Sequence, residues 1–107
     1  MTFRVIFSPE ARDDLSAIYL YVAQAAGENV AFGYIERIEK YCRDLRDFPE
    51  RGARRDDLFP GLRVVGFERR VSIAFHIGHA VPTIDRILYG GRNLSVLRDD
   101  GQPDPPE

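Results

Sequence analysis

The sequence has a single cysteine, Cys42, a single lysine, Lys40, and no tryptophan among its 107 residues. One cysteine leaves no intrachain disulfide and no thiolate cage for a metal, which is typical of a protein of the reducing cytoplasm. The longest apolar run, residues 17–23, is far shorter than the roughly 20 residues of a membrane span, and the first residues have no signal-peptide pattern. Because 44% of the residues are hydrophobic, most of the chain is predicted to fold. We expect one small globular domain with no cofactor, no metal and no membrane contact.

Charge is spread unevenly along the chain, although the net charge is only −2. Residues 1–50 carry −3, residues 51–98 carry +5 and residues 99–107 carry −4. A basic second half is typical of a protein with an anionic partner, and solvating arginines explain it equally well. The last nine residues are acidic and rich in proline, so we expect a disordered tail after a single domain of residues 1–98.

The first half of the chain predicts a short strand followed by two helices. Residues 3–7 are β-branched and aromatic, as in a strand. Ser8-Pro9 is a helix-start signal, apolar residues then recur at steps of three and four, and Gly27 ends the helix. A second helix is predicted from about Glu28 to Asp47, with an apolar stripe that ends at Phe48. With almost no linker, the two helices should form an antiparallel hairpin.

The second half predicts three strands joined by short turns. They lie at residues 62–65, 70–77 and 80–89, after a polar loop at residues 53–61. In the middle strand, alternation places Val71, Ile73, Phe75 and Ile77 on one face and Ser72, Ala74 and His76 on the other. The order predicts an α+β fold, in which the helical hairpin covers one face of a mainly antiparallel sheet of about four strands.

Four motifs occur in a fixed order along this predicted topology. They are Ser8-Pro9-x-Ala11-x-x-Asp14-Leu15 followed by Ile18, Tyr21 and Ala23; Leu45-x-x-Phe48-Pro49-x-x-Gly52; Gly61-Leu62-Arg63; and the closing run from Arg86 to Leu94. Together they resemble the ParE branch of the RelE/ParE toxin superfamily, over residues 3–98. The chain departs from the family pattern at Phe75-His76, where Tyr-Arg is frequent, and at Tyr89 and Asn93, where the family has histidine and aspartate.

The resemblance implies the toxin of a type II toxin–antitoxin module, which stabilises a plasmid or chromosome. Its partner would be a ParD-like antitoxin, acidic and folding on binding. ParE-type toxins are associated with poisoning DNA gyrase and so blocking replication, whereas RelE-type toxins cut messenger RNA on the ribosome, and the shared fold does not choose between them. We favour binding to gyrase over catalysis, with the mRNA endonuclease and a non-toxic interaction module of the same fold as alternatives. Sequence-specific DNA binding by this chain is not expected.

An endonuclease would need a general base for the 2′-hydroxyl and cations for the phosphorane, and the candidates are His76, Arg86, Tyr89 and Arg92. The structural alternative is that His76 is a half-buried strand residue and Tyr89 a core or interface aromatic. We favour this alternative, because a general acid or base must lie within hydrogen-bond reach of a posed substrate and nothing in the sequence indicates this. The ParE-like closing motif and the absence of a sheet lysine also count against a nuclease.

Binding residues are predicted from the surplus of apolar side chains on the first helix. Residues 18–22 are all apolar or aromatic, and five consecutive positions span more than one turn. Part of this surface either lines the seam between the helices or forms a groove for an amphipathic antitoxin helix. The predicted antitoxin contacts are Tyr19, Leu20, Tyr34, Arg63 and Arg92, and the predicted target contacts are Arg63, Arg86 and Arg92.

Several charged residues also have a plain structural interpretation. Arg63, Arg86 and Arg92 would then pair with Asp85, Glu68 or the tail. The loop arginines Arg51, Arg54 and Arg55 either bind phosphate or are neutralised by Asp56 and Asp57, which we prefer. Asp13-Asp14 reads as a solvated pair, and Cys42 as an inert buried thiol on the apolar stripe of the second helix.

Overall fold

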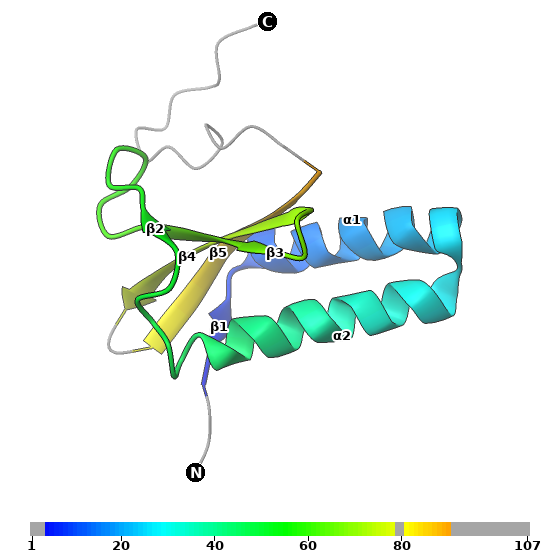
Figure 1. Ribbon diagram of the computed structural model, residues 1–107, viewed down its shortest axis with the longest axis horizontal. Helices are drawn as coiled ribbons and strands as arrows, with labels where there is room; N and C mark the ends of the chain where they lie inside the picture. The colour runs from blue at the N-terminus through cyan, green and yellow to red at the C-terminus, as the bar shows by residue number, and fades with distance from the viewer. Residues whose placement is uncertain (1–3, 79–80, 91–107) are drawn as a thin grey trace, which may run out of the picture.

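The computed structural model describes residues 4–78 and 81–90, so Arg92 and the predicted tail at residues 99–107 lie outside the described residues. The described part contains two helices and five strands (Figure 1). In chain order they are β1 (Ile6–Phe7), α1 (Pro9–Ala26), α2 (Glu28–Asp44), β2 (Ala53–Arg54), β3 (Arg63–Phe67), β4 (Val71–Gly78) and β5 (Val81–Tyr89). Neither helix is both long and apolar enough to cross a membrane.

The helical hairpin begins and turns where the sequence predicts. The Ser8 side chain accepts a hydrogen bond from the Ala11 N–H at 3.0 Å, which caps α1, and Pro9 takes the first helical position. Ser8 also ties this cap to the sheet, because its N–H donates to the Ile84 carbonyl and its hydroxyl to the Asp85 carbonyl. At the far end Gly27, with φ of +100°, is the only residue between the helices.

The sheet has the order β1-β5-β4-β3-β2. All neighbouring pairs are antiparallel except β1 and β5, so the predicted α+β fold with a mainly antiparallel sheet is confirmed. The fifth strand, β2, lies in the segment predicted to be a loop. It reaches the edge of β3 because Gly52, with φ of +80°, lets the backbones approach: a Cβ on Gly52 would lie 2.4 Å from the Val64 carbonyl oxygen.

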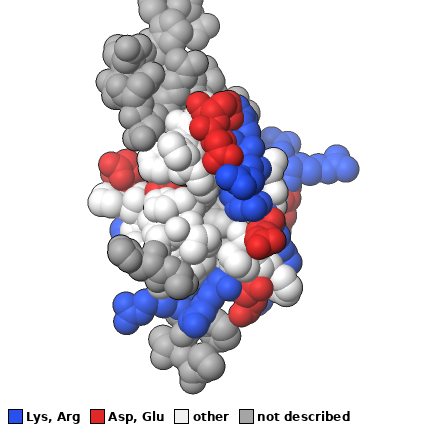
Figure 2. All heavy atoms as spheres, turned by 90° about the vertical axis from the view of Figure 1, so that its left-hand side faces the viewer, with Lys and Arg blue, Asp and Glu red and all other residues white. Residues whose placement is uncertain are grey.

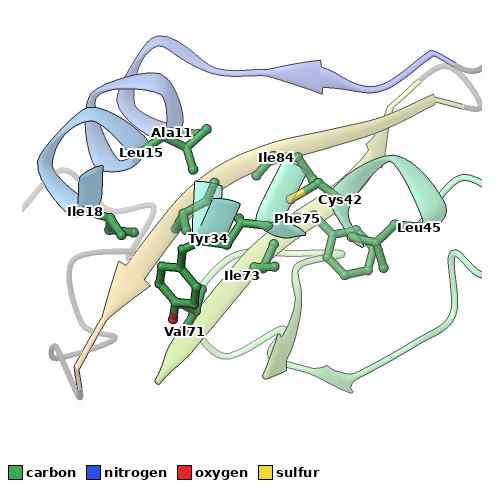
Figure 3. Close-up of a cluster of buried hydrophobic side chains, with 12 residues drawn as sticks. Ala11, Leu15, Ile18, Tyr34, Cys42, Leu45, Val71, Ile73, Phe75 and Ile84 are labelled. Atoms are coloured by element: carbon green, nitrogen blue, oxygen red, sulfur yellow. The ribbon is translucent and has the colours of Figure 1, made fainter. Parts of the chain in front are cut away.

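The main core lies between the hairpin and one face of the sheet (Figure 3). The stripe of α1 and α2 residues meets the inward residues of β4 and β5, and the buried members are Ala11, Leu15, Ile18, Tyr34, Ile38, Cys42, Leu45, Val71, Ile73, Phe75, Ile84 and Ile87. Burial of each large apolar side chain stabilises the fold by about 1.5–3 kcal/mol. Cys42 is completely buried, as predicted, and burial raises the pKa of its thiol to about 12.

A smaller core lies on the opposite face of the sheet. Leu58 and Leu62 from the loop pack on Ala74 of β4. The central strand is therefore covered on both faces, which explains why Ala74 is buried as well as Ile73 and Phe75.

The predicted end of the second helix is wrong. α2 ends at Asp44, three residues early, because the N–H of Leu45 turns back to the carbonyl of Cys42 in a tight last turn. Phe48 is consequently outside the helix and 54% exposed, with the Arg51 guanidinium over its ring. Ile77 alternates with Ile73 and Phe75 as predicted, but it is 43% exposed, near the end of β4.

Candidate functional site

A groove of about 680 Å³ runs between α1 and α2 on the outer side of the hairpin. Its lining is mainly apolar with a few polar and charged side chains, namely Phe7, Arg12, Leu15, Ser16, Tyr19, Leu20, Phe32, Ile35 and Glu39. No residue of β2 to β5 lines it, so this face of the two-helix layer points away from most of the sheet. Concave apolar surfaces of this kind are where an amphipathic helix binds.

Tyr19 and Leu20, which the sequence singles out, both line this groove. Leu20 is 62% exposed, which is a large exposure for a leucine in a helix. Phe32 on α2 is 61% exposed and faces Leu20 across the same groove, but the sequence analysis missed it. The available signal was an aromatic residue one position outside the apolar stripe of the second helix.

Tyr34 does not share that groove. Only 9% of the residue is exposed, and its ring packs edge-on to Tyr89 at 6.2 Å and under the Arg37 guanidinium at 5.3 Å. Burial is the main cause that raises the pKa of Tyr34. Its role as an antitoxin contact stays a prediction, and little of its surface is accessible to a partner.

Neither Arg63 nor Arg86 pairs with Asp85 or Glu68, and the tail, the third predicted partner, lies outside the described residues. Arg63 donates from Nη1 to the backbone carbonyls of Glu50 and Gly52 at 2.9 and 3.5 Å, so it holds the segment that leads into β2. Asp85 is instead bonded to His76, and Glu68 to Arg37 of α2. These partners come together only through the fold, because they are 9 and 31 residues apart in the chain.

Arg86 forms its ion pair with Asp14, which the sequence analysis took for a solvated carboxylate. Arg86 Nε and Nη2 donate to the two Asp14 oxygens at 2.8 and 3.0 Å, and the Ile87 N–H donates to the same carboxylate at 2.8 Å. The Asp14 side chain is only 9% exposed. It is buried because α1 lies along the edge of β5 where β1 has already ended.

Two of the three loop arginines are neutralised locally, as preferred from the sequence, whereas the Arg51 guanidinium lies over the rings of Tyr41 and Phe48. Arg54 pairs with Asp56, and Arg55 forms two hydrogen bonds with Asp57. Figure 2, which views the molecule from the end opposite the hairpin tip, shows basic and acidic side chains next to each other around a largely uncharged centre. On this face the described residues form no continuous basic patch of the kind that nucleic acid requires.

The candidate endonuclease residues are not brought together. His76 Nδ1 lies 2.7 Å from Asp85 Oδ2, and its ring stacks on Phe59. In the β4–β5 register His76 is opposite Thr83, whereas Tyr89 is opposite Val71, about 20 Å further along the strand at the usual rise per residue. Arg86 is engaged with Asp14, and Arg92 lies outside the described residues. Among the described residues, no three His, Cys, Asp or Glu side chains are arranged to hold a metal.

Comparison with known proteins agrees with this fold. The model of the family described as the ParE toxin of the type II toxin–antitoxin system parDE matches residues 5–94. The sequence is 33% identical over 93 residues to Toxin ParE3 of Caulobacter vibrioides, covering 87% of this chain and 92% of that protein. The structure is similar to the solved chromosomal ParDE TA system from P. aeruginosa, with a TM-score of 0.71 and 26% identity over 83% of this chain and 97% of that one.

The family match and the similar fold place this chain in the class of type II toxin–antitoxin toxins. The chain belongs to the ParE toxin family, so the resemblance carried by the four motifs is confirmed.

Proposed function

We propose that the outer groove of the hairpin binds an amphipathic helix of a cognate ParD-like antitoxin. The observation that carries this proposal is the exposure of Leu20 and Phe32, one from each helix, on opposite walls of one groove. Two large apolar side chains left in water at the same place are typical of a surface that a partner covers. The similar structure from P. aeruginosa is described as a ParDE system, which supports an antitoxin of this kind.

We further propose that the toxin acts by binding DNA gyrase and thereby stops replication. Membership of the ParE family supports this target, and the separation of His76 from Tyr89 counts against catalysis by that set. The ribosome-dependent endonuclease and the non-toxic interaction module are the alternatives that the experiments below distinguish.

The groove is tested with Leu20→Ala and Phe32→Ala, measured for antitoxin affinity and for thermal stability. As hot spots of the interface, each should lower affinity by about 2 kcal/mol, or roughly thirtyfold, with little change in melting temperature. Ile77→Ala is the matched control, because Ile77 is also an exposed aliphatic residue but lies on β4, away from the groove. Unchanged affinity in both groove variants would show that the antitoxin binds elsewhere.

The target is tested by adding the purified toxin to a gyrase supercoiling and cleavage assay, beside a translation-coupled RNA-cleavage assay. We expect inhibited supercoiling and intact RNA. Cleaved RNA with unaffected gyrase would establish the endonuclease instead, and no effect on either, without growth inhibition in cells, would establish a non-toxic module.

A further inference from the structure

The hairpin has a second concave surface, on the side that faces the sheet. The helices extend past the end of the sheet, so their tip forms an overhang (Figure 1). Under it lies a pocket of about 250 Å³, which we call the overhang pocket. It is lined by Val22, Val30, Tyr34, Arg37, Glu68, Arg70 and Tyr89.

The overhang pocket and the outer groove share no lining residue, and on α2 they lie on opposite sides of the helix. On α2 the groove uses Phe32, Ile35 and Glu39, whereas the pocket uses Val30, Tyr34 and Arg37. Successive helical residues are about 100° apart, which places the two sets on roughly opposite sides of the helix. A helix bound in the groove therefore leaves the pocket uncovered.

The side chains of the overhang pocket are those of a protein-binding hot spot. Tyr89 packs against Tyr34 and also against Tyr21, whose ring centroid is 5.4 Å away, so a row of tyrosines continues from the pocket along α1. Val30 is 54% exposed and supplies an aliphatic wall. Tyrosine and arginine around an apolar floor are the residues most enriched at such sites.

The charged residues of the pocket indicate which chemical group of a partner would bind there. Arg37 is neutralised by a two-bond pair with Glu68. Arg70 is exposed and has no ion-pair partner among the described residues. One uncompensated guanidinium beside tyrosine hydroxyls, which can donate hydrogen bonds, matches a carboxylate.

We propose that the overhang pocket is where the toxin holds its protein target, through an acidic side chain of the target that meets Arg70 and a neighbouring aliphatic side chain that packs on Val30. The inference rests on the proposed function, because it assigns the groove to the antitoxin and the pocket to the target. Toxicity and antitoxin recognition are then carried by different residues of the same hairpin.

The test compares Arg70→Gln and Val30→Ser with Arg69→Gln, a neighbouring exposed arginine in the β3–β4 turn that does not line the pocket. We expect the two pocket variants to lower gyrase affinity and growth inhibition by at least about tenfold. Their antitoxin affinity and melting temperature should stay at the wild-type values, and Arg69→Gln should change neither activity.

The outcomes separate this inference from the proposed target. If the wild-type toxin does not bind gyrase, that target is wrong, and growth inhibition in cells becomes the readout for the pocket. The inference is overturned if Arg70→Gln and Val30→Ser remain as toxic as wild type. It is equally overturned if they lose antitoxin binding in parallel with toxicity, because the pocket would then belong to the antitoxin interface.

Discussion

Arg86 of β5 and Asp14 of α1 form a two-bond ion pair across 72 positions of the chain, and the same carboxylate accepts the Ile87 N–H. The Arg86 side chain is 23% exposed and that of Asp14 is 9% exposed, so solvent screens this pair only weakly. The pair joins the first helix to the last strand, and these two elements supply Tyr21 and Tyr89, whose rings pack against each other.

We predict that Asp14→Ala lowers the free energy of unfolding by about 2–4 kcal/mol, because it leaves a partly buried guanidinium and a backbone N–H without an acceptor. Asp13→Ala is the control, since Asp13 is exposed and has no partner among the described residues. It should change stability by less than about 0.5 kcal/mol. Urea unfolding of both variants measures the difference, and equal effects would show that the ion pair contributes nothing.

A second prediction compares two glycines with similar backbone angles. Gly52 has φ of +80° and Gly61 has φ of +83°, but only at Gly52 would a Cβ collide with another backbone. Gly61→Ala should cost about 1–2 kcal/mol from the left-handed conformation alone. Gly52→Ala should cost more than this, because β2 must move away from β3. Thermal unfolding of the pair checks the order, and a smaller loss at Gly52 would mean that β2 pairing adds little to stability.

A third prediction concerns the buried thiol of Cys42. Its folded-state pKa of about 12 is above the ordinary value of 9.0, so the folded protein holds the proton more tightly than the unfolded chain. This stabilisation is therefore complete below about pH 9 and is lost as the pH rises from 9 towards 12. At pH 8 a thiol reagent should label the native protein only at the rate of unfolding and the denatured protein at once. Rapid labelling of the native state would show that the α2 core is open.

A fourth prediction separates the structural from the catalytic interpretation of His76. Its Nδ1 is bonded to Asp85 and its ring stacks on Phe59, far from Tyr89 along the sheet. His76→Gln should therefore leave growth inhibition within about twofold of wild type, at a stability cost of about 1 kcal/mol for the lost hydrogen bond. Growth assays at matched expression levels provide the measurement. If a folded His76→Gln variant lost its toxicity, the endonuclease would become the favoured function.

Local signals in the sequence were sufficient for the helices and for the long strands. Ser8-Pro9 and Gly27 set the helix start and the turn through bonds to residues three or four positions away, so a local pattern is enough to find them. β2 could not be predicted in this way. It is only two residues long, and it exists because Gly52 lets it approach Val64, a contact between distant parts of the chain.

The outer groove could be predicted only in part, because only some of its residues belong to a local pattern. Tyr19 and Leu20 belong to an apolar run longer than one stripe requires, which is visible in the sequence. Phe32 stands alone on α2, and the pairing of Asp14 with Arg86 depends on how α1 lies against β5. Such relationships have no local pattern, so only the three-dimensional structure reveals them.

The carboxylate of Asp14 has one more consequence, for how the molecule behaves in a crowded solution. β5 pairs with β1 only at Thr83 and Ile84, and further along its edge Asp14 accepts the Ile87 N–H, where another chain's strand would otherwise offer a carbonyl. The opposite edge is the two-residue β2, whose Arg54 is ion-paired with Asp56. Short or blocked edges are what keep natural sheets from polymerising. At these positions the sheet is thus protected against edge-to-edge pairing with a second copy of the chain.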